Sequence, residues 1–544
     1  MKKTIIYFLF IILWYSTTYS QIPQINVTWG LEQKGSAGNN DKEQSYNIGK
    51  DLSGGFYSLR EKYKYLYGQV SGVKRFIDHF NSDGKLIGSE KIIIEKENSK
   101  RFFDGIFYNE GRMYLVTNYF RASDKMNVLS VQSINPNTLL VEDDIRGIAE
   151  IPYKIELLYW FKHYTIKVVN DKIYALHLGP VKESEQVILG IHVFDKDFKL
   201  QWKHYQTLDY KEDLFLLEDY DVDHEGTIRV MATVYKDKKR KTREGKPNYD
   251  YHFFVFSNKG IDFKEHSLTL SNKFITDMRF SYRANGDIVC TGFYSNESSW
   301  LWSNTIAGAF FVTIDPETTH IKMENFMAFS QEFLTSFMSA DAAEKGKELK
   351  NFDLKNFHFL ENGGAILLAE EITESQTNIA ITTSYTSTNR TEYATNYTTT
   401  TTTNNINWTN FQFDNIIIIK INQGGIIEWA KIIPKKQHTT ADGGIFSSFA
   451  TAYIGDKIYL IYNDNPKNLT SINGKIYGFK KSKEAIVVCT EIDFDGNINK
   501  KALFSAGEAE ILTCPGSCRQ TSINSMSIYG KKGKSFKWGI LEFQ

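Results

Sequence analysis

Polar turns followed by strands of alternating apolar residues recur along the chain. The segments 111–115, 171–175, 226–230, 286–290 and 456–460 each begin with Gly or Asp, and in each the next apolar residues stand two and four positions later, as Ile228 and Val230 do after Gly226. Segment 363–367 fits this first pattern, and segment 63–67 fits it without the turn residue. A period of two is that of a half-buried strand. The chain is therefore predicted to consist of strands joined by tight turns.

A second pattern is an apolar strand that ends in Asp, Asn or Ser, often with Gly three residues later. The copies with Gly are Asn81 with Gly84, Ser257 with Gly260, Asn422 with Gly425 and Asp493 with Gly496, and those without it are Asn135, Asp195 and Asp315. Gly at that position suits a type I turn closed by a left-handed residue, which is a common hairpin connection. The two patterns alternate along the whole chain, so each period contains two hairpins and predicts four antiparallel strands.

Repeated small sheets bury both of their faces only by stacking on one another, and radial stacking gives a β-propeller. Seven copies of each pattern predict an all-β propeller of seven four-stranded blades, with eight or six blades as alternatives. The stretch Phe536 to Phe543 has the pattern of a strand and is expected to close the ring against the first blade or to belong to an eighth one. A β-sandwich would not repeat a hairpin pair in this way, and a parallel β-helix has a shorter period without antiparallel turns.

The repeat is interrupted twice. Near 331–349, Phe333 and Phe337 stand four residues apart, as do Leu334 and Met338, which predicts a short amphipathic helix inserted between blades. The stretch 373–410 consists mainly of Thr, Asn, Ser and Tyr. It has few large aliphatic side chains to bury, so we expect a mobile loop. Two glycosylation sequons, at Asn389 and Asn407, leave a glycosylated or adhesive lobe as the alternative.

The first twenty residues have the pattern of an export signal. Lys2 and Lys3 precede an apolar run from Ile5 to Tyr15, and small residues follow up to Ser20. This predicts a signal peptide over 1–20, an N-terminal extension over 21–56 and the propeller over 57–544. An uncleaved anchor is the alternative, but the run is shorter than the roughly 20 residues that span a bilayer. The expected location is outside the cytoplasm: periplasmic, extracellular or at the cell surface.

Charge and composition narrow the range of partners. The sequence has 64 basic and 64 acidic side chains, so no net charge attracts it to nucleic acid, which we do not expect as a partner. No later stretch is long and apolar enough for stable membrane insertion. The aromatic share of 14% favours strands.

Four cysteines are too few for a disulfide framework. Cys514 and Cys518 flank a Pro-Gly turn, and in an oxidising compartment they could form a disulfide. Half of a metal site is the rival interpretation, and no further ligands stand nearby in the sequence. Cys290 and Cys489 fall on apolar positions of the repeat and are expected to be buried thiols.

Motifs with a defined mechanism are absent from the sequence. It contains no HExxH, no GxSxG, no GxxxxGK[ST] and no paired CxxC. Asp219, Asp221 and Asp223 have the spacing of calcium-loop ligands, but His224 stands where that loop needs Gly, so a strand end and a turn are the preferred interpretation. The histidines are expected at the surface or in hydrogen bonds. The sequence therefore names no catalytic residue, no metal ligand and no cofactor.

Two turns followed by a Trp, from Asp195 to Trp202 and from Asn422 to Trp429, resemble the blade-locking pattern of quinoprotein-type propellers. The chain as a whole resembles uncharacterised secreted bacterial β-propeller proteins. That resemblance implies the fold. The Thr-Gly pair of the quinoprotein motif is missing, so quinone binding is not implied, and the sialidase box is not present either.

Three hypotheses for function follow. The first is a secreted or periplasmic binding scaffold, without catalysis, whose loops recognise an unidentified protein or glycan. The second is a carbohydrate-active enzyme with two carboxylates at the mouth of the propeller channel. The third is a cell-surface adhesin that uses the Thr-rich segment 373–410.

Overall fold

The computed structural model describes residues 25–35, 41–66, 69–94, 101–152, 164–180, 186–238, 242–243, 246–270, 273–283, 285–296, 305–316, 320–390, 395–471 and 474–543. The signal peptide predicted for residues 1–20 lies outside the described residues.

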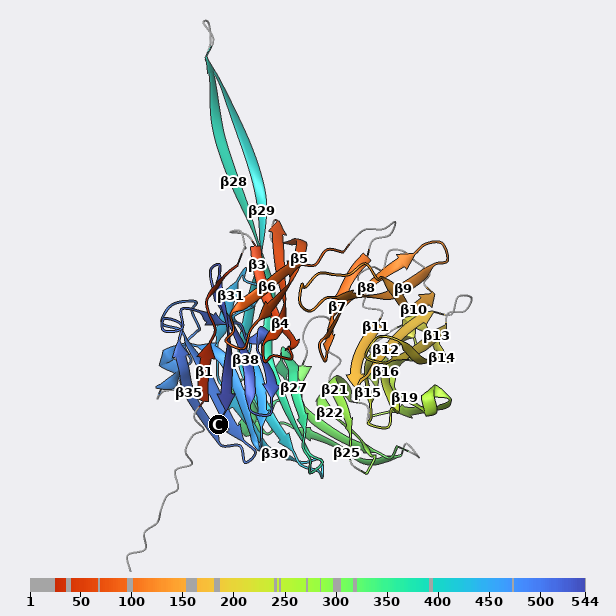
Figure 1. The fold of residues 1–544 in the computed structure, drawn as a ribbon. Coiled ribbons are helices and arrows are strands. Elements are labelled where there is room, and N and C mark those ends of the chain that lie inside the picture. Colours follow the sequence, from red (N-terminus) through yellow and green to blue (C-terminus); the bar gives the residue numbers. More distant parts are fainter. Residues whose placement is uncertain are drawn as a thin grey trace, which may run out of the picture.

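Four-stranded antiparallel sheets follow one another along the chain (Figure 1). The first sheet contains β3 (Asp41–Lys50), β4 (Phe56–Leu66), β5 (Gln69–Phe80) and β6 (Leu86–Lys91). The second contains β7 (Arg101–Asn109), β8 (Arg112–Arg121), β9 (Met126–Ile134) and β10 (Arg146–Pro152). The third contains β11 (Tyr164–Val169), β12 (Lys172–Pro180), β13 (Gln186–Phe194) and β14 (Leu200–Lys211). The fourth contains β15 (Phe215–Val222), β16 (Ile228–Tyr235), β19 (Tyr249–Ser257) and β20 (Asp262–Leu268).

The same arrangement continues to the C-terminus. The fifth sheet contains β21 (Phe274–Tyr282), β22 (Ile288–Ser295), β24 (Gly308–Ile314) and β25 (Ile321–Ala328). The sixth contains β27 (Phe352–Phe359), β28 (Ala365–Arg390), β29 (Thr395–Ile421) and β30 (Ile427–Ile433), with β31 (Gln437–Thr440) paired to β29. The seventh contains β32 (Ala450–Ile454), β33 (Lys457–Asp464), β34 (Ile486–Asp493) and β35 (Ile498–Ser505). The eighth contains β36 (Leu512–Thr513), β37 (Arg519–Ser522), β38 (Ser525–Lys532), β39 (Ser535–Phe543), β1 (Ile25–Trp29) and β2 (Gln33–Lys34).

Small elements occupy the connections. The pairs β17 (Thr242–Arg243) with β18 (Lys246–Pro247) and β23 (Thr305–Ile306) with β26 (Leu349–Lys350) form two short ladders. The helices are α1 (Gln331–Thr335) and α2 (Ala340–Glu344), and the 3-10 turns are η1 (Glu212–Leu214), η2 (Asn258–Gly260), η3 (Pro466–Leu469) and η4 (Pro515–Ser517).

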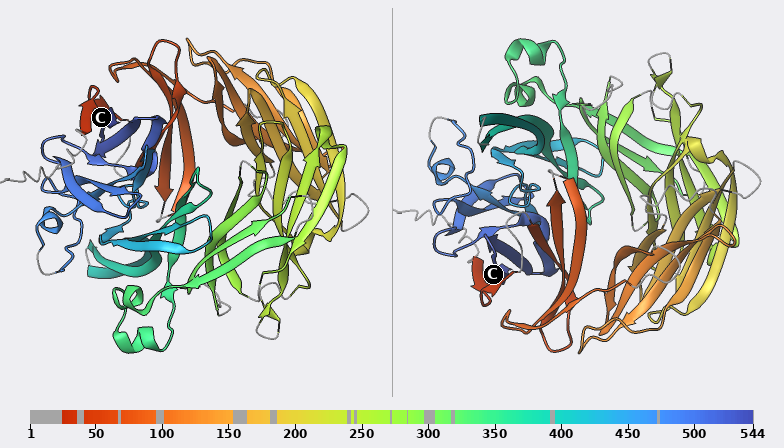
Figure 2. Two further views of the ribbon diagram at one scale, coloured as in Figure 1. Left: turned by 90° about the horizontal axis from the view of Figure 1, so that it is seen from below. Right: turned by 90° about the horizontal axis from the view of Figure 1, so that it is seen from above.

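Hydrophobic clusters lie between every pair of neighbouring sheets, which closes them into a ring (Figure 2). The last of these interfaces joins the eighth sheet to the first. There Trp538, 1% exposed, lies with its ring centroid 5.4 Å from that of Phe56 and 4.8 Å from that of Tyr529. The fold is therefore a β-propeller, as the repeat predicted.

The described sheets of four or more strands number eight. That is one more blade than the two repeat patterns indicated, and it is the larger of the two alternatives left open. The additional blade is assembled from both ends of the chain, because β1 pairs antiparallel with β39 from Ile25 opposite Phe543 to Trp29 opposite Gly539. The described parts of segment 21–56, residues 25–35 and 41–56, consequently belong to the propeller and not to an extension outside it. They supply the outer strand of the eighth sheet and, in β3, the first strand of the first sheet.

Most copies of the two sequence patterns become two kinds of tight turn at one end of the ring. The exceptions are segment 63–67, of which residues 63–66 lie inside β4, and the Asn135 copy, which begins the longer connection 135–145. At Asp223 the carboxylate accepts the backbone N–H groups of Glu225 and Thr227, and Gly226 adopts φ +87°. This is a conformation that Gly adopts without the steric cost that a Cβ brings. First-to-second and third-to-fourth strand connections both lie at this end, because neighbouring strands are antiparallel. We call it the turn face, and the opposite end, with the remaining connections, the loop face.

The stretch 373–410, predicted to be a mobile loop, is instead a ribbon formed by the continuation of β28 and β29 beyond their sheet (Figure 1). The two strands pair from Ile372 opposite Phe413 to Arg390 opposite Thr395. The prediction of a loop was based only on the small number of large aliphatic side chains that this stretch could bury. Thr and Tyr also favour extended backbone, and a two-stranded ladder pairs backbone groups without needing a core.

A buried ion pair holds the base of this ribbon. Lys435 Nζ lies 2.7 Å from Glu370 Oε1 in β28, and it donates to the carbonyl oxygen of Phe413 in β29 at 2.8 Å. Both charged side chains are 0% exposed.

Within the stretch 331–349 the structure has two short helices where the sequence predicted one. Ser330 caps the N-terminus of α1 by accepting the N–H of Phe333, and Ser339 caps α2 by accepting that of Ala342. The second cap ends the first helix early, because Ser at an N-cap favours non-helical backbone. None of the helices in the described ranges has the length and apolar character that crossing a bilayer would require.

Candidate functional site

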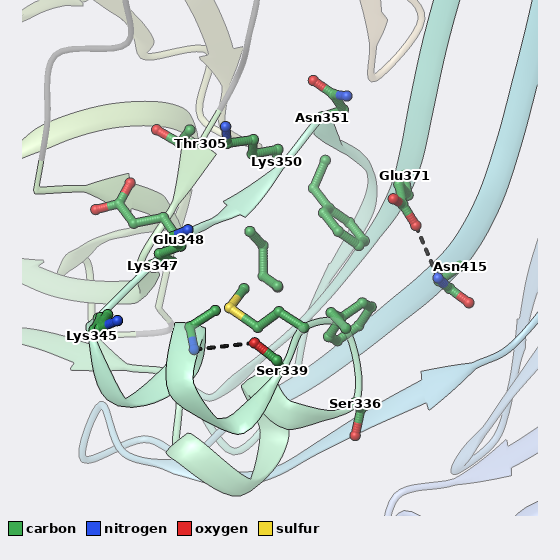
Figure 3. A pocket seen from close by; sticks show the side chains of 16 residues that line it. Thr305, Ser336, Ser339, Lys345, Lys347, Glu348, Lys350, Asn351, Glu371 and Asn415 are labelled. Carbon is green, nitrogen blue, oxygen red and sulfur yellow. Dashed lines mark hydrogen bonds between the residues drawn. The ribbon is translucent and has the colours of Figure 1, made fainter.

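A pocket of about 780 Å³ opens on the loop face beside the helical insertion (Figure 3). Its walls come from the segment between α1 and α2, from α2 and the segment after it, from β23, β26 and the start of β27, and from the bases of β28 and β29. The polar residues that line it are Thr305, Ser336, Ser339, Lys345, Lys347, Glu348, Lys350, Asn351, Glu371 and Asn415. Its volume falls within the range of about 300–1,000 Å³ that is usual for small-ligand sites.

Apolar side chains form part of the lining of this pocket. The rings of Phe337 and Phe352 meet edge to face with centroids 5.6 Å apart, and Met338 and Leu349 lie beside them. Leu349 is 2% exposed and Phe352 is 3% exposed, so both belong to the core beneath the pocket. An apolar surface with a polar rim suits a ligand that has both characters, such as a sugar ring.

Lysines give the rim a positive character. Lys345 is paired with Asp341 at 2.9 Å, and Glu348 accepts the hydroxyl of Ser295 and the N–H of Asn296. Lys347 and Lys350 are exposed, and within the part of the chain that the structure describes neither has an ion-pair partner. Two ammonium groups are therefore available to an acidic ligand.

A carboxyl group lies on the opposite wall. Glu371 accepts a hydrogen bond from Asn415 Nδ2 at 2.9 Å (Figure 3). Burial raises the pKa of Glu371 above its ordinary value, the Asn415 hydrogen bond opposes that rise, and the charge of Asp414 adds to it. A carboxyl group with a raised pKa adds less negative charge to the pocket than an exposed one would.

A second cluster, which we call the carboxylate cluster, consists of Glu218, Asp277 and Arg279 on β15 and β21. It lines a small cavity of about 120 Å³ between the fourth and fifth sheets. These are the first strands of their sheets, and the first strands of neighbouring sheets contact each other, as β3 does with β7 and β21 with β27. The cluster therefore lies at the inner edge of the ring.

Partial desolvation acts on both acids in the carboxylate cluster: Glu218 is an exposed residue and Asp277 is a half-buried one. It raises the pKa of Glu218, against a hydrogen bond from Thr233 Oγ1 at 2.6 Å, and the charge of Asp277 adds to the rise. It also raises the pKa of Asp277, against the charge of Arg279, whose Nη1 lies 3.2 Å from Asp277 Oδ1. Two carboxyl groups with raised pKa values beside a cavity can in principle perform acid–base chemistry.

Regular β-bulges place these side chains. The ladder between first and second strands shifts register at Asn47/Gly49, Phe103/Gly105, Leu217/Asp219, Ile275/Asp277 and Leu354/Asn356. Glu218 lies within its bulge and Asp277 lies directly after its own. A bulge re-aims side chains and is frequent beside functional sites.

Sequence reasoning missed the carboxylate cluster, because its acids belong to no spaced motif. One signal was available. A Cβ on Gly292, which pairs with Met278, would lie 2.0 Å from the carbonyl oxygen of Asp277. A glycine inside an otherwise apolar strand often marks a bulge or a close backbone approach.

The structure places the predicted disulfide pair at the inner side of the eighth sheet. Cys514 and Cys518 flank η4, and both are free thiols. Cys518 Sγ donates to the carbonyl oxygen of Cys514 at 3.4 Å, so the thiol faces backbone rather than the other sulfur and no disulfide is formed in this structure. Cys290 and Cys489 are 0% and 1% exposed, which confirms them as buried thiols, and burial raises the pKa of Cys489 to about 12.

Two of the histidines are buried. His177 and His192 are 1% and 2% exposed, with ring centroids 5.3 Å apart. His192 Nε2 lies 3.1 Å from the hydroxyl of Tyr205. Burial, with a smaller effect from Lys203, lowers the pKa of His192 from 6.5 to about 4, so the imidazole is neutral near neutral pH.

Comparisons with known proteins add little on function. No protein-family model and no curated protein matches the sequence. Among solved structures, a polysaccharide lyase is 12% identical, with 94% of this chain and 100% of that chain covered and a TM-score of 0.35. A mutant of the Synechocystis apocarotenoid oxygenase is 9% identical, with 87% and 91% covered and a TM-score of 0.36.

The β-propeller domain of the Trilobed protease from Pyrococcus furiosus is 8% identical, with 85% of this chain and 96% of that chain covered and a TM-score of 0.31. At such identities and scores these likenesses carry no conclusion about activity. The assignment as a propeller rests on the eight sheets and their interfaces.

Proposed function

We propose that this chain is an exported binding scaffold without catalytic activity, in which the loop face binds a partner and the ring holds that face rigid. The observation that carries the proposal is the division between the two faces. Tight turns make up most of the described connections of the turn face, and the connection between β9 and β10, residues 135–145, is a longer one. The helical insertion, the ribbon and the large pocket all belong to the loop face, and binding residues commonly lie on loops held by a rigid framework.

The pocket beside α1 and α2 favours an acidic oligosaccharide as the partner. Lys347 and Lys350 suit carboxylate or sulfate groups, and the Phe337 and Phe352 rings suit the apolar face of a sugar. The carboxyl group of Glu371 lies on the opposite wall, where it accepts a hydrogen bond from the amide of Asn415.

Binding of acidic and neutral oligosaccharides by the chain from Gln21 onward tests the proposal, with thermal shift as a screen and calorimetry for affinity. An acidic oligosaccharide should raise the melting temperature, because a ligand that binds the folded state stabilises it. The double variant Lys347→Ala/Lys350→Ala should lose about tenfold in affinity, the effect of about 1.4 kcal/mol. The control Lys85→Ala/Lys199→Ala removes two exposed lysines from the turn face and should bind like wild type. Equal loss in both double variants, or no shift with any acidic oligosaccharide, contradicts the proposal.

The carboxylate cluster supports a second candidate, a carbohydrate-active enzyme whose active site lies at the inner edge of the ring. In such enzymes one protonated carboxyl acts as general acid and a second carboxylate acts as base or nucleophile. Desolvation raises the pKa of both Glu218 and Asp277, which suits either of them as the general acid and leaves the other as the base or nucleophile. The cavity of about 120 Å³ is smaller than the usual ligand site, which is why the scaffold is preferred.

Release of reducing sugar from polysaccharides distinguishes the two candidates. If the enzyme hypothesis is right, Glu218→Gln and Asp277→Asn each abolish release. Asp219→Asn, on the same strand and 37% exposed, should leave release unchanged. Wild-type protein that binds an acidic oligosaccharide without cleaving it favours the scaffold.

A further inference from the structure

The ribbon formed by β28 and β29 has open edges. The strand β31 pairs with β29 only from Asn410 to Phe413, and β27 pairs with β28 only as far as Glu371. Beyond these points, among the described residues, the two strands pair only with each other, up to Arg390 opposite Thr395. At about 3.3 Å per residue this ribbon extends roughly 60 Å from the ring.

A ribbon of this kind is poorly suited to exist alone. An isolated two-stranded hairpin is at best marginally stable in water, and each open edge carries unpaired N–H and C=O groups. Natural proteins protect such edges with charged residues, proline or bulges. The β29 sequence from Thr395 to Phe413 has no charged residue, no Pro and no Gly, and it includes six successive threonines from Thr398 to Thr403.

We propose that the outer edge of β29, from Thr395 to Thr409, pairs antiparallel with the same edge of a second copy of this chain. The two ribbons then form one four-stranded sheet across a twofold axis. At its base this edge already receives a third strand, β31, so the backbone there is oriented to continue a sheet.

The sequence of the two strands selects this edge and this partner. Glu374 and Arg390 stand at the two ends of the ribbon part of β28, with no charged residue between them, whereas the ribbon part of β29 has none, so two copies of β29 meet without repulsion. A twofold contact uses the same surface on both copies and closes after two chains. Joining the β29 edges leaves the β28 edges outside, where Glu374 and Arg390, at the two ends of the edge, disfavour further addition.

The molar mass in solution of the chain from Gln21 onward, measured by light scattering over a concentration series, tests the pairing. Wild type should pass from monomer to dimer as concentration rises. A variant in which Asn-Gly replaces residues 376–409 closes the hairpin at the pair Ser375 and Asn410 and should remain a monomer. Its retained binding of any oligosaccharide that wild type binds would show that the propeller is intact.

A matched pair of double variants identifies the edge. Thr399→Lys/Thr401→Lys places two charges on β29, and Ser384→Lys/Thr386→Lys places two on the residues directly opposite in β28. The first should abolish the dimer and the second should preserve it. A wild type that stays monomeric, a dimer that survives removal of the ribbon, an open-ended assembly, or loss of the dimer only with the β28 variant would each overturn the proposal.

Discussion

Replacing Lys435 with Met removes one half of the buried ion pair at the base of the ribbon. In the wild type the ammonium group has three acceptors: Glu370 at 2.7 Å, the Phe413 carbonyl oxygen at 2.8 Å and Gln437 Oε1 at 3.1 Å. In the variant Glu370 keeps a hydrogen bond from Ser448 at 2.6 Å, but its charge remains out of water. Removing one partner of a buried pair costs about 3–5 kcal/mol, and we expect that loss of unfolding free energy.

The measurement is urea unfolding followed by tryptophan fluorescence and far-UV circular dichroism. The double variant Lys435→Met/Glu370→Leu should recover most of the loss, because both charges leave the interior together. Lys345→Met is the matched control. Its pair with Asp341 is 67% and 74% exposed, and its loss should stay within about 0.5 kcal/mol. The reasoning is refuted if Lys435→Met is as stable as the control, or if the two buried substitutions destabilise additively.

Three further predictions concern the core. The free energy of unfolding should decrease below neutral pH because of His192. The pKa of His192 is about 4 in the folded state and 6.5 in the unfolded state, so the unfolded state binds the proton more tightly. Up to about 3 kcal/mol of unfolding free energy that is present above pH 6.5 is therefore lost by pH 4. Urea midpoints against pH should show a smaller slope for His192→Phe, and an unchanged slope in that variant would exclude His192 as the cause. Trp538→Ala, at the interface of the eighth and first sheets, should cost about 3–5 kcal/mol by urea unfolding, and a loss below about 1 kcal/mol would mean that this interface does not hold the ring closed. Gly292→Ala should cost about 1–3 kcal/mol in the same assay because its Cβ would meet the Asp277 carbonyl. Gly105→Ala, with open space around its Cβ, is the control, and equal effects of the two would contradict the steric argument.

The repeat predicted most of the fold because its turns need particular residues. Asp223 and Gly226 make one kind of turn, and Asp493 with Gly496 makes the other. The eighth sheet was harder to assign, since β1 and β39 come from opposite ends of the chain and no local pattern relates Ile25 to Phe543.

The ribbon and the candidate sites escaped prediction for different reasons. Composition indicated a loop over 373–410, because a core is the usual source of order and a ladder between two polar strands leaves no hydrophobic signal. Glu218 and Asp277 meet across two blades, and only the register shifts bring them to one cavity. Local sequence patterns do not predict contacts between residues as far apart in the sequence as Glu218 and Asp277.

The pairing of β1 with β39 also has a consequence for the order of folding. The ring cannot close until Phe543 has been synthesised, so β1 stays unpaired until β39 is available. Bringing Ile25 to Phe543 through an otherwise unfolded chain costs about 5 kcal/mol of loop-closure entropy. Prior stacking of the intervening blades reduces that cost, because it brings the two ends close together. Closure is then expected to be the final step, and a chain that stops short of β39 should leave the first and seventh blades exposed to proteases.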